Sequence, residues 1–149
     1  MLILNNGVLY IQIYEYFKNE IKPKLDEKNF EYYVIRNERF SELALYSFDK
    51  GERFEPDYLL FIRKKKISKD VVDYQVFIEP KGNQFLEEDI WKEIFLEKIQ
   101  DFSKLKKDNS KNLELIKDED HFLIGFPFFN REHRNKEFSE AIQKFLAEL

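Results

Sequence analysis

Two apolar runs dominate the stretch RFEPDYLLFIRKKKISKDVVDYQVFIEPKG (residues 53–82), where a charged segment joins them. Residues 57–63 and 73–79 have the length and the β-branched and aromatic content of buried strands. A hairpin centred on Ser68 gives its paired positions a constant sum of 136, which sets Asp57 opposite Glu79 at the open end. Because side chains alternate along a strand, Lys81 shares a face with Glu79, and Pro80 points away.

Helix and strand patterns alternate around this hairpin. Residues 8–28 are ambiguous, because VLYIQI alternates like a strand whereas Ile13, Phe17 and Ile21 have helical spacing. We favour a helix over 11–21 that stops before Pro23. Further helices are expected over 87–99, with Ile90, Trp91, Ile94, Phe95 and Ile99 on one face, and around 138–146. Further strands are expected over 31–37, 43–48, 112–116 and 121–126.

This element order predicts a mixed α/β fold with a single domain over residues 1–149. At 149 residues, 43% hydrophobic and 36% charged, the chain has the composition of one globular domain. Helical spacing predicts that Phe95, Ile99, Phe138, Ile142 and Phe145 are buried against the sheet.

Composition excludes several classes of function. The chain has no cysteine, which rules out disulfides, thiolate nucleophiles and cysteine-ligated zinc. This composition fits a reducing, cytoplasmic compartment. The sequence contains neither a membrane-spanning run nor a secretory signal. A net charge of −4 argues against a strong stand-alone binder of polyanions. It remains compatible with a nucleic-acid enzyme whose binding surface lies mostly on another module.

The charges at the open end of the hairpin suggest phosphoryl chemistry. Two carboxylates at cross-strand distance repel each other unless a cation lies between them. Oxygen ligands without sulfur or imidazole suit Mg²⁺ or Mn²⁺, which assist hydrolysis at phosphorus. Lys81 would neutralise the transition state or orient and deprotonate the attacking water. The structural alternative is that Asp57 ends a turn and that Glu79 and Lys81 form a solvated pair.

Pro56-Asp57 followed by Glu79-Pro80-Lys81 resembles the motif of the PD-(D/E)xK nuclease superfamily. The resemblance is closest to the C-terminal endonuclease domain of the restriction (Res) subunit of type III restriction enzymes. It extends from about Val34 to Phe138 over five ordered segments. These segments are RNE at 36–38, FEPDYLLF at 54–61, FIEPKGN at 77–83, WKE with FL at 91–96, and GFPFFN at 125–130.

The resemblance implies a central mixed sheet flanked by helices, restriction-endonuclease-like, and Mg²⁺-dependent cleavage of double-stranded DNA. By position, Asp57 and Glu79 would be metal ligands and Lys81 the catalytic lysine. The carbonyl of Pro80 would be a further ligand, and Mn²⁺ could replace Mg²⁺. The implied partners are DNA, the helicase portion of Res and the methyltransferase (Mod) subunit, with no membrane involved.

Some relatives add a glutamate from the first helix, for which Glu15 and Glu20 are candidates here. Glu38 lies in a matching segment without an assigned role. The helicase motor that precedes the nuclease in that family is absent from this sequence. No phosphate-binding loop G-x-x-x-x-G-K-[ST] exists, so we expect no ATP site. We expect the chain to be excised from such a motor or to lack it.

Two cations are candidates for DNA contacts, Lys92 near the start of the predicted helix over 87–99 and Arg134 near the start of the last helix. Two alternatives to a type III endonuclease domain remain open. One is a non-catalytic module of the same fold that docks onto a motor or methyltransferase. The other is a different nuclease of the superfamily, such as a repair nuclease.

Overall fold

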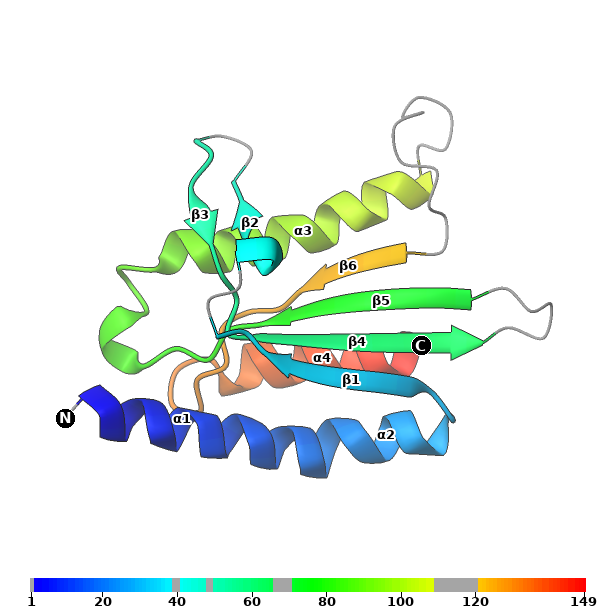
Figure 1. Cartoon of the computed structure of the whole chain (residues 1–149), viewed down its shortest axis with the longest axis horizontal. Coiled ribbons are helices and arrows are strands. Elements are labelled where there is room, and N and C mark those ends of the chain that lie inside the picture. Colours follow the sequence, from blue (N-terminus) through cyan, green and yellow to red (C-terminus); the bar gives the residue numbers. More distant parts are fainter. Residues whose placement is uncertain (1, 39–40, 48–49, 66–70, 109–120) are drawn as a thin grey trace.

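The computed structural model describes residues 2–38, 41–47, 50–65, 71–108 and 121–149. A four-stranded sheet in the order β1-β4-β5-β6 forms its centre (Figure 1). β4 pairs antiparallel with both β1 and β5, whereas β5 and β6 are parallel. The strands are β1 (Glu31–Arg36), β4 (Tyr58–Lys65), β5 (Val71–Ile78) and β6 (His121–Gly125), with a separate pair β2 (Leu45–Tyr46) and β3 (Arg53–Phe54).

Helices lie on both faces of this sheet (Figure 1). The helical segments are α1 (Leu2–Tyr16), a π-helical turn (Phe17–Ile21), α2 (Lys22–Glu27), α3 (Ile90–Asp108) and α4 (Asn135–Glu148), with short 3₁₀ turns at Ser41–Leu43 and Asn83–Phe85. The prediction of a mixed α/β fold with a mixed central sheet flanked by helices is therefore confirmed. In the part of the chain that the structure describes, no helix combines the length and the apolar character needed to cross a bilayer.

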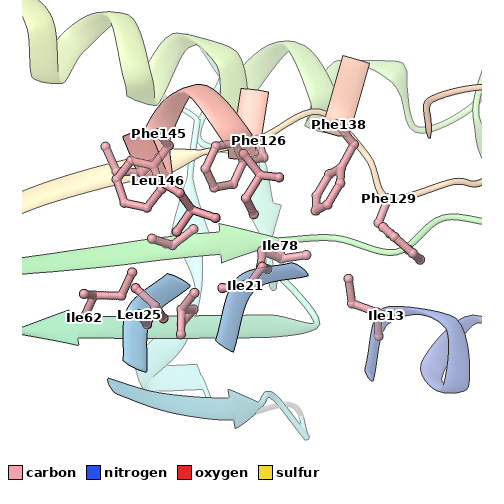
Figure 2. Packing of buried hydrophobic residues seen from close by; sticks show 14 residues of the cluster. Ile13, Ile21, Leu25, Ile62, Ile78, Phe126, Phe129, Phe138, Phe145 and Leu146 are labelled. Carbon is pink, nitrogen blue, oxygen red and sulfur yellow. The ribbon is translucent and has the colours of Figure 1, made fainter. Parts of the chain in front are cut away.

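The larger hydrophobic cluster lies between the sheet and the helices α1, α2 and α4 (Figure 2). Strand alternation explains its composition, because Leu60 and Ile62 face this side while Leu59 faces the other. The helical side chains of the cluster include the predicted core residues Phe138, Ile142 and Phe145.

A second cluster fills the opposite face, between the sheet, α3 and β3. Phe95 and Ile99 of α3 are buried there, as predicted. The backbone of α3 lies very close to β6 at Gly125. A Cβ atom built at this position would lie only 2.1 Å from the carbonyl oxygen of Leu96. Only glycine permits this approach, so α3 is fixed against the sheet on the face that also carries Asp57 and Glu79.

The first helix differs from its prediction over 11–21. α1 begins at Leu2, and helical structure continues through the π turn into α2. Pro23 does not end the helix, because it occupies the first turn of α2, directly after the π turn. The missing N–H of a proline is tolerated in the first turn of a helix.

Two further predictions were partly wrong. Of the strand predicted over 43–48, the structure describes residues 43–47, and within these only Leu45–Tyr46 is a strand, which pairs with β3 outside the main sheet. On α3, Ile90 and Ile94 are exposed, at 40% and 45%, since the face toward the sheet is centred on Leu96 instead. The strand predicted over 112–116 lies outside the described residues. The predicted strands over 31–37 and 121–126 match β1 and β6.

Candidate functional site

The β4–β5 hairpin has the predicted register. Tyr58 pairs with Ile78 at one end and Lys65 with Val71 at the other, so that Asp57 and Glu79 follow as the next opposed positions. Their contact is direct, because the backbone N–H of Asp57 donates to Oε2 of Glu79 at 2.8 Å. At this end of the sheet β4 begins and β1, β5 and β6 end, which is the left-hand end in Figure 1.

Lys81 is held on the same face as Glu79 by a short extension of the sheet beyond β5. An isolated parallel bridge pairs Pro80 with Phe129. The N–H of Phe129 donates to the carbonyl of Glu79 at 2.9 Å, and the N–H of Lys81 donates to the carbonyl of Phe129 at 3.0 Å. The backbone therefore stays extended past Glu79. Nζ of Lys81 lies 3.1 Å from Oε1 of Glu79, and both side chains are nearly buried.

The carboxyl groups of Glu79 and Asp57 are hard to ionise. Burial, followed by repulsion from Asp57, raises the pKa of Glu79 to about 7, against the attraction of Lys81. Burial also raises the pKa of Asp57, although the charges of Lys81, Arg36 and Lys92 oppose this shift. The nearby cations therefore do not fully compensate the two carboxylates when both are ionised. This imbalance favours the binding of an additional cation.

The pKa of Lys81 is also raised, which for a lysine favours the charged form. Burial lowers the pKa of its ammonium, but the charge of Glu79 and the hydrogen bonds with Asp89 and Glu79 outweigh burial, so the net shift is upward. Lys81 is therefore a fixed positive charge beside the two carboxylates at neutral pH.

Asp89 is a member of the cluster that the sequence analysis missed. It lies one residue before α3, where Oδ2 accepts from Nζ of Lys81 at 2.7 Å and Oδ1 lies 3.2 Å from Nζ of Lys92. Burial opposes its ionisation, but the hydrogen bonds and charges of Lys81 and Lys92 lower its pKa overall. The available signal was its spacing, an acid three residues before Lys92 at the start of a helix.

A pocket of about 380 Å³ opens beside Asp57. Its lining comes from α1, from the end of β1 and the segment after it, and from the residue before β4: Tyr10, Arg36, Asn37, Glu38 and Asp57. The N–H of Asn37 donates to the carbonyl of Asp57 at 2.7 Å, which ties the end of β1 to the start of β4. Asp57 is therefore the cluster acid that also faces a pocket large enough for part of a ligand.

The three candidate additional acids lie in different surroundings. Glu38 lines the pocket with Asp57. Glu15 lies on α1, where Oε2 is 3.5 Å from the guanidinium of Arg131. Glu20 is exposed on the π-helical turn. Glu38 is thus the candidate whose position adjoins Asp57, although the sequence analysis gave it no role.

The two candidate DNA-binding cations also differ in their surroundings. Lys92 lies close enough to Asp57 for its charge to favour ionisation of that acid. Arg134 instead contacts buried Glu93, with Nε 3.1 Å from Oε1 and 3.2 Å from Oε2. Glu93 also accepts from the N–H of Phe128 at 2.8 Å. Arg134 therefore neutralises a buried acid and secures the chain between β6 and α4.

The donor set fits a hard divalent cation with few protein ligands. Among the residues placed in the structure, no group of three or more His, Cys, Asp or Glu side chains could hold a metal ion. Asp57 and Glu79 are two carboxylates of the cluster whose mutual repulsion a cation would relieve. The bridge to Phe129 uses the carbonyl of Glu79 and leaves that of Pro80 out of the ladder. These oxygen donors suit Mg²⁺, which keeps several waters.

Fold and cluster together define a mixed α/β domain with a buried acid–acid–lysine group at one end of its sheet. The chain belongs to the family described as HI_1054_C, a C-terminal domain, whose model matches residues 9–148. It is also similar to a protein of Haemophilus influenzae (strain ATCC 51907 / DSM 11121 / KW20 / Rd) that is described as an uncharacterized protein. The two are 36% identical over 126 residues, which cover 80% of this chain and 26% of the relative. No solved structure matches the chain.

Proposed function

We propose that this domain is a Mg²⁺-dependent endonuclease that hydrolyses phosphodiester bonds of double-stranded DNA, as a PD-(D/E)xK nuclease. The observation that carries the proposal is the convergence of Asp57, Glu79 and Lys81 at one strand end. The register pairs the two acids, and Lys81 Nζ lies 3.1 Å from Glu79. The mixed sheet flanked by helices also agrees with what the resemblance to that superfamily implies.

Each member of the cluster has a distinct role in this chemistry. Asp57 and Glu79 would hold the cation, with the carbonyl of Pro80 as a further donor. A Mg²⁺ or Mn²⁺ ion held there would supply positive charge beside the phosphodiester and a water of lowered pKa. Lys81 stabilises the negative charge that develops at phosphorus. Its raised pKa favours this electrostatic role over proton abstraction, because a lysine that acts as a base needs a lowered pKa.

The wider assignment follows the resemblance to type III restriction enzymes. In such a system the domain would act in the cytoplasm with the helicase portion of Res and the Mod methyltransferase subunit. The chain aligns with about a quarter of the length of its Haemophilus influenzae relative. The activity and partners of the longer protein are therefore part of the proposal.

One observation favours a non-catalytic docking module as the second candidate. Both oxygens of Glu79 already have partners, the N–H of Asp57 and the ammonium of Lys81. A cluster paired in this way is able to close the end of the sheet without a metal. The two candidates differ in what the removal of one charge does to cleavage and to folding.

The test compares Asp57→Asn and Lys81→Ala in a form of the protein whose wild type cleaves DNA. We expect both variants to lose cleavage of duplex DNA in Mg²⁺ by at least about 10²-fold, with unchanged circular dichroism. Asp73→Asn and Lys65→Ala make the same changes at the far end of the hairpin and should cleave normally. Wild-type rates in either site variant refute the catalytic assignment, and variants that unfold favour the structural role.

A further inference from the structure

Arg36 differs from the other arginines that the structure describes. Four of them lie within ion-pair distance of a carboxylate: Arg53 of Glu55, Arg63 of Asp73, Arg131 of Glu15 and Arg134 of Glu93. Arg36 forms no such pair with any described residue. It lines the pocket beside Asp57, and its guanidinium is exposed. A hydrogen bond with the Tyr10 side chain and the nearby charge of Glu38 help to raise its pKa, so Arg36 is a charged group beside the pocket without an ion pair of its own.

Tyr10 fixes the position of this guanidinium. The Cζ atom of Arg36 lies 4.0 Å from the centre of the Tyr10 ring, which is a cation–π contact. The Tyr10 ring in turn packs edge-on against Tyr58, with centroids 6.0 Å apart. Tyr58 is also the strand partner of Arg36 and the neighbour of Asp57 in the chain. The guanidinium is thus held at a set position relative to the first metal-ligand candidate.

The other cations that favour ionisation of Asp57 are already engaged. Asp89 contacts both Lys81 and Lys92, at 2.7 Å and 3.2 Å. Both lysines can stabilise negative charge from their present positions. To contact a ligand in the pocket, however, each would have to break its ion pair with Asp89. When a guanidinium stacks on an aromatic ring, its flat face contacts the ring. The N–H groups along its edge can then donate two hydrogen bonds to an oxyanion.

We infer that Arg36 binds a phosphate group of the DNA backbone in the pocket beside Asp57, and that Tyr10 is its positioning residue. This inference rests on the proposed function and names the group that anchors its substrate. The pocket volume of about 380 Å³ is at the lower end of the range for ligand sites, enough for one phosphate and its sugar. A chain with net charge −4 needs such localised contacts, because it offers little general attraction to a polyanion.

Binding measurements test the inference separately from catalysis. The 149-residue chain is titrated with a fluorescent DNA duplex in Ca²⁺, across a series of salt concentrations. We expect Arg36→Ala to weaken binding roughly 10-fold near 0.1 M salt and to reduce the slope of log K against log salt by about 0.9. Arg36→Lys keeps the charge without the fork and should lie between the two. Arg63→Ala, the same charge change at the far end of the sheet, serves as the matched control.

Variants of Tyr10 test the positioning role. Tyr10→Leu removes the ring and should weaken DNA binding toward the level of Arg36→Ala, whereas Tyr10→Phe keeps the ring and should restore most of it. Inorganic phosphate distinguishes the sources of the ligand group. If millimolar phosphate displaces the duplex from the wild type as effectively as unlabelled DNA does, the pocket is a free-phosphate site and the inference is overturned.

The remaining outcomes separate the two proposals. If Arg36→Ala binds DNA with wild-type affinity and salt slope while Asp57→Asn has lost cleavage, the inference about Arg36 is wrong and the proposed function stands. If Asp57→Asn still cleaves, the proposed function fails whatever Arg36 does. A wild-type chain that does not bind duplex DNA overturns the inference about Arg36 without touching the cleavage test, which uses a form that cuts.

Discussion

Glu79→Gln should make the metal-free protein more stable at pH 8 and less stable at pH 4.5. Folded Glu79 keeps its proton up to about pH 7, whereas its ordinary pKa is 4.5. Between these values the folded state binds more protons than the unfolded state, so the free energy of unfolding falls as the pH rises. The difference between 4.5 and about 7 corresponds to roughly 3 kcal/mol for this 4%-exposed side chain. The glutamine does not titrate, so the variant escapes this loss.

The pKa of about 7 already contains the attraction between Lys81 and ionised Glu79, but the variant also loses the hydrogen bond that protonated Glu79 accepts from Lys81, so the net gain is smaller. That contact contributes on the order of 1–2 kcal/mol, while the acceptor for the N–H of Asp57 survives. We therefore expect Glu79→Gln to be about 1–2 kcal/mol more stable than the wild type at pH 8, with the order reversed at pH 4.5.

The assay is urea unfolding followed by the fluorescence of Trp91, in EDTA, at several pH values. Glu27→Gln, at the exposed end of α2, makes the same chemical change and serves as the matched control. A stability difference that stays constant between pH 4.5 and 8 refutes the argument, because Glu79 would then titrate as an ordinary glutamate. Replacing EDTA by Mg²⁺ should stabilise the wild type and not the variant, because the ligand binds only the intact site.

Two other predictions concern the core and the lysine. Phe95→Ala and Ile142→Ala, one from each face of the sheet, should each lower the free energy of unfolding by about 2–5 kcal/mol in denaturant titrations; no loss in either would contradict their burial. Asp89→Asn removes an anion that raises the pKa of Lys81, so the alkaline limb of the cleavage–pH profile should move to lower pH while Asp89→Glu partly restores it. An unshifted profile would mean that Asp89 does not act through Lys81.

The hairpin and its register were predictable from the sequence because they depend on local information. Two apolar strands of equal length around one turn fix which residues are opposed, and strand alternation adds Lys81 to the face of Glu79. The prediction failed where tertiary packing decides. The approach of α3 to Gly125 sets which face of that helix is buried, and so exposes Ile94. No spacing rule reveals this contact.

The members of the site that escaped prediction share the same cause. Asp89 meets Lys81 because α3 starts next to the end of β5, and Tyr10 meets Arg36 because α1 passes under the end of β1. Both contacts join elements whose relative placement comes from the core and not from local sequence. The continuation of the helix through Pro23 was missed because the π turn before it has no simple sequence signature.

The bridge between Pro80 and Phe129 joins segments about 50 residues apart, and closing so long a loop costs entropy before the contact forms. A ribosome releases β4 and β5 well before Phe129, so a nascent chain is able to pair Asp57 with Glu79 early. The backbone around Lys81 takes its final position only when the C-terminal third of the chain packs against the sheet and Phe129 pairs with Pro80. If the domain is a nuclease, the order of synthesis therefore makes it assemble its two acids first and its lysine last. An unfinished chain would carry the two acids without the anchored ammonium.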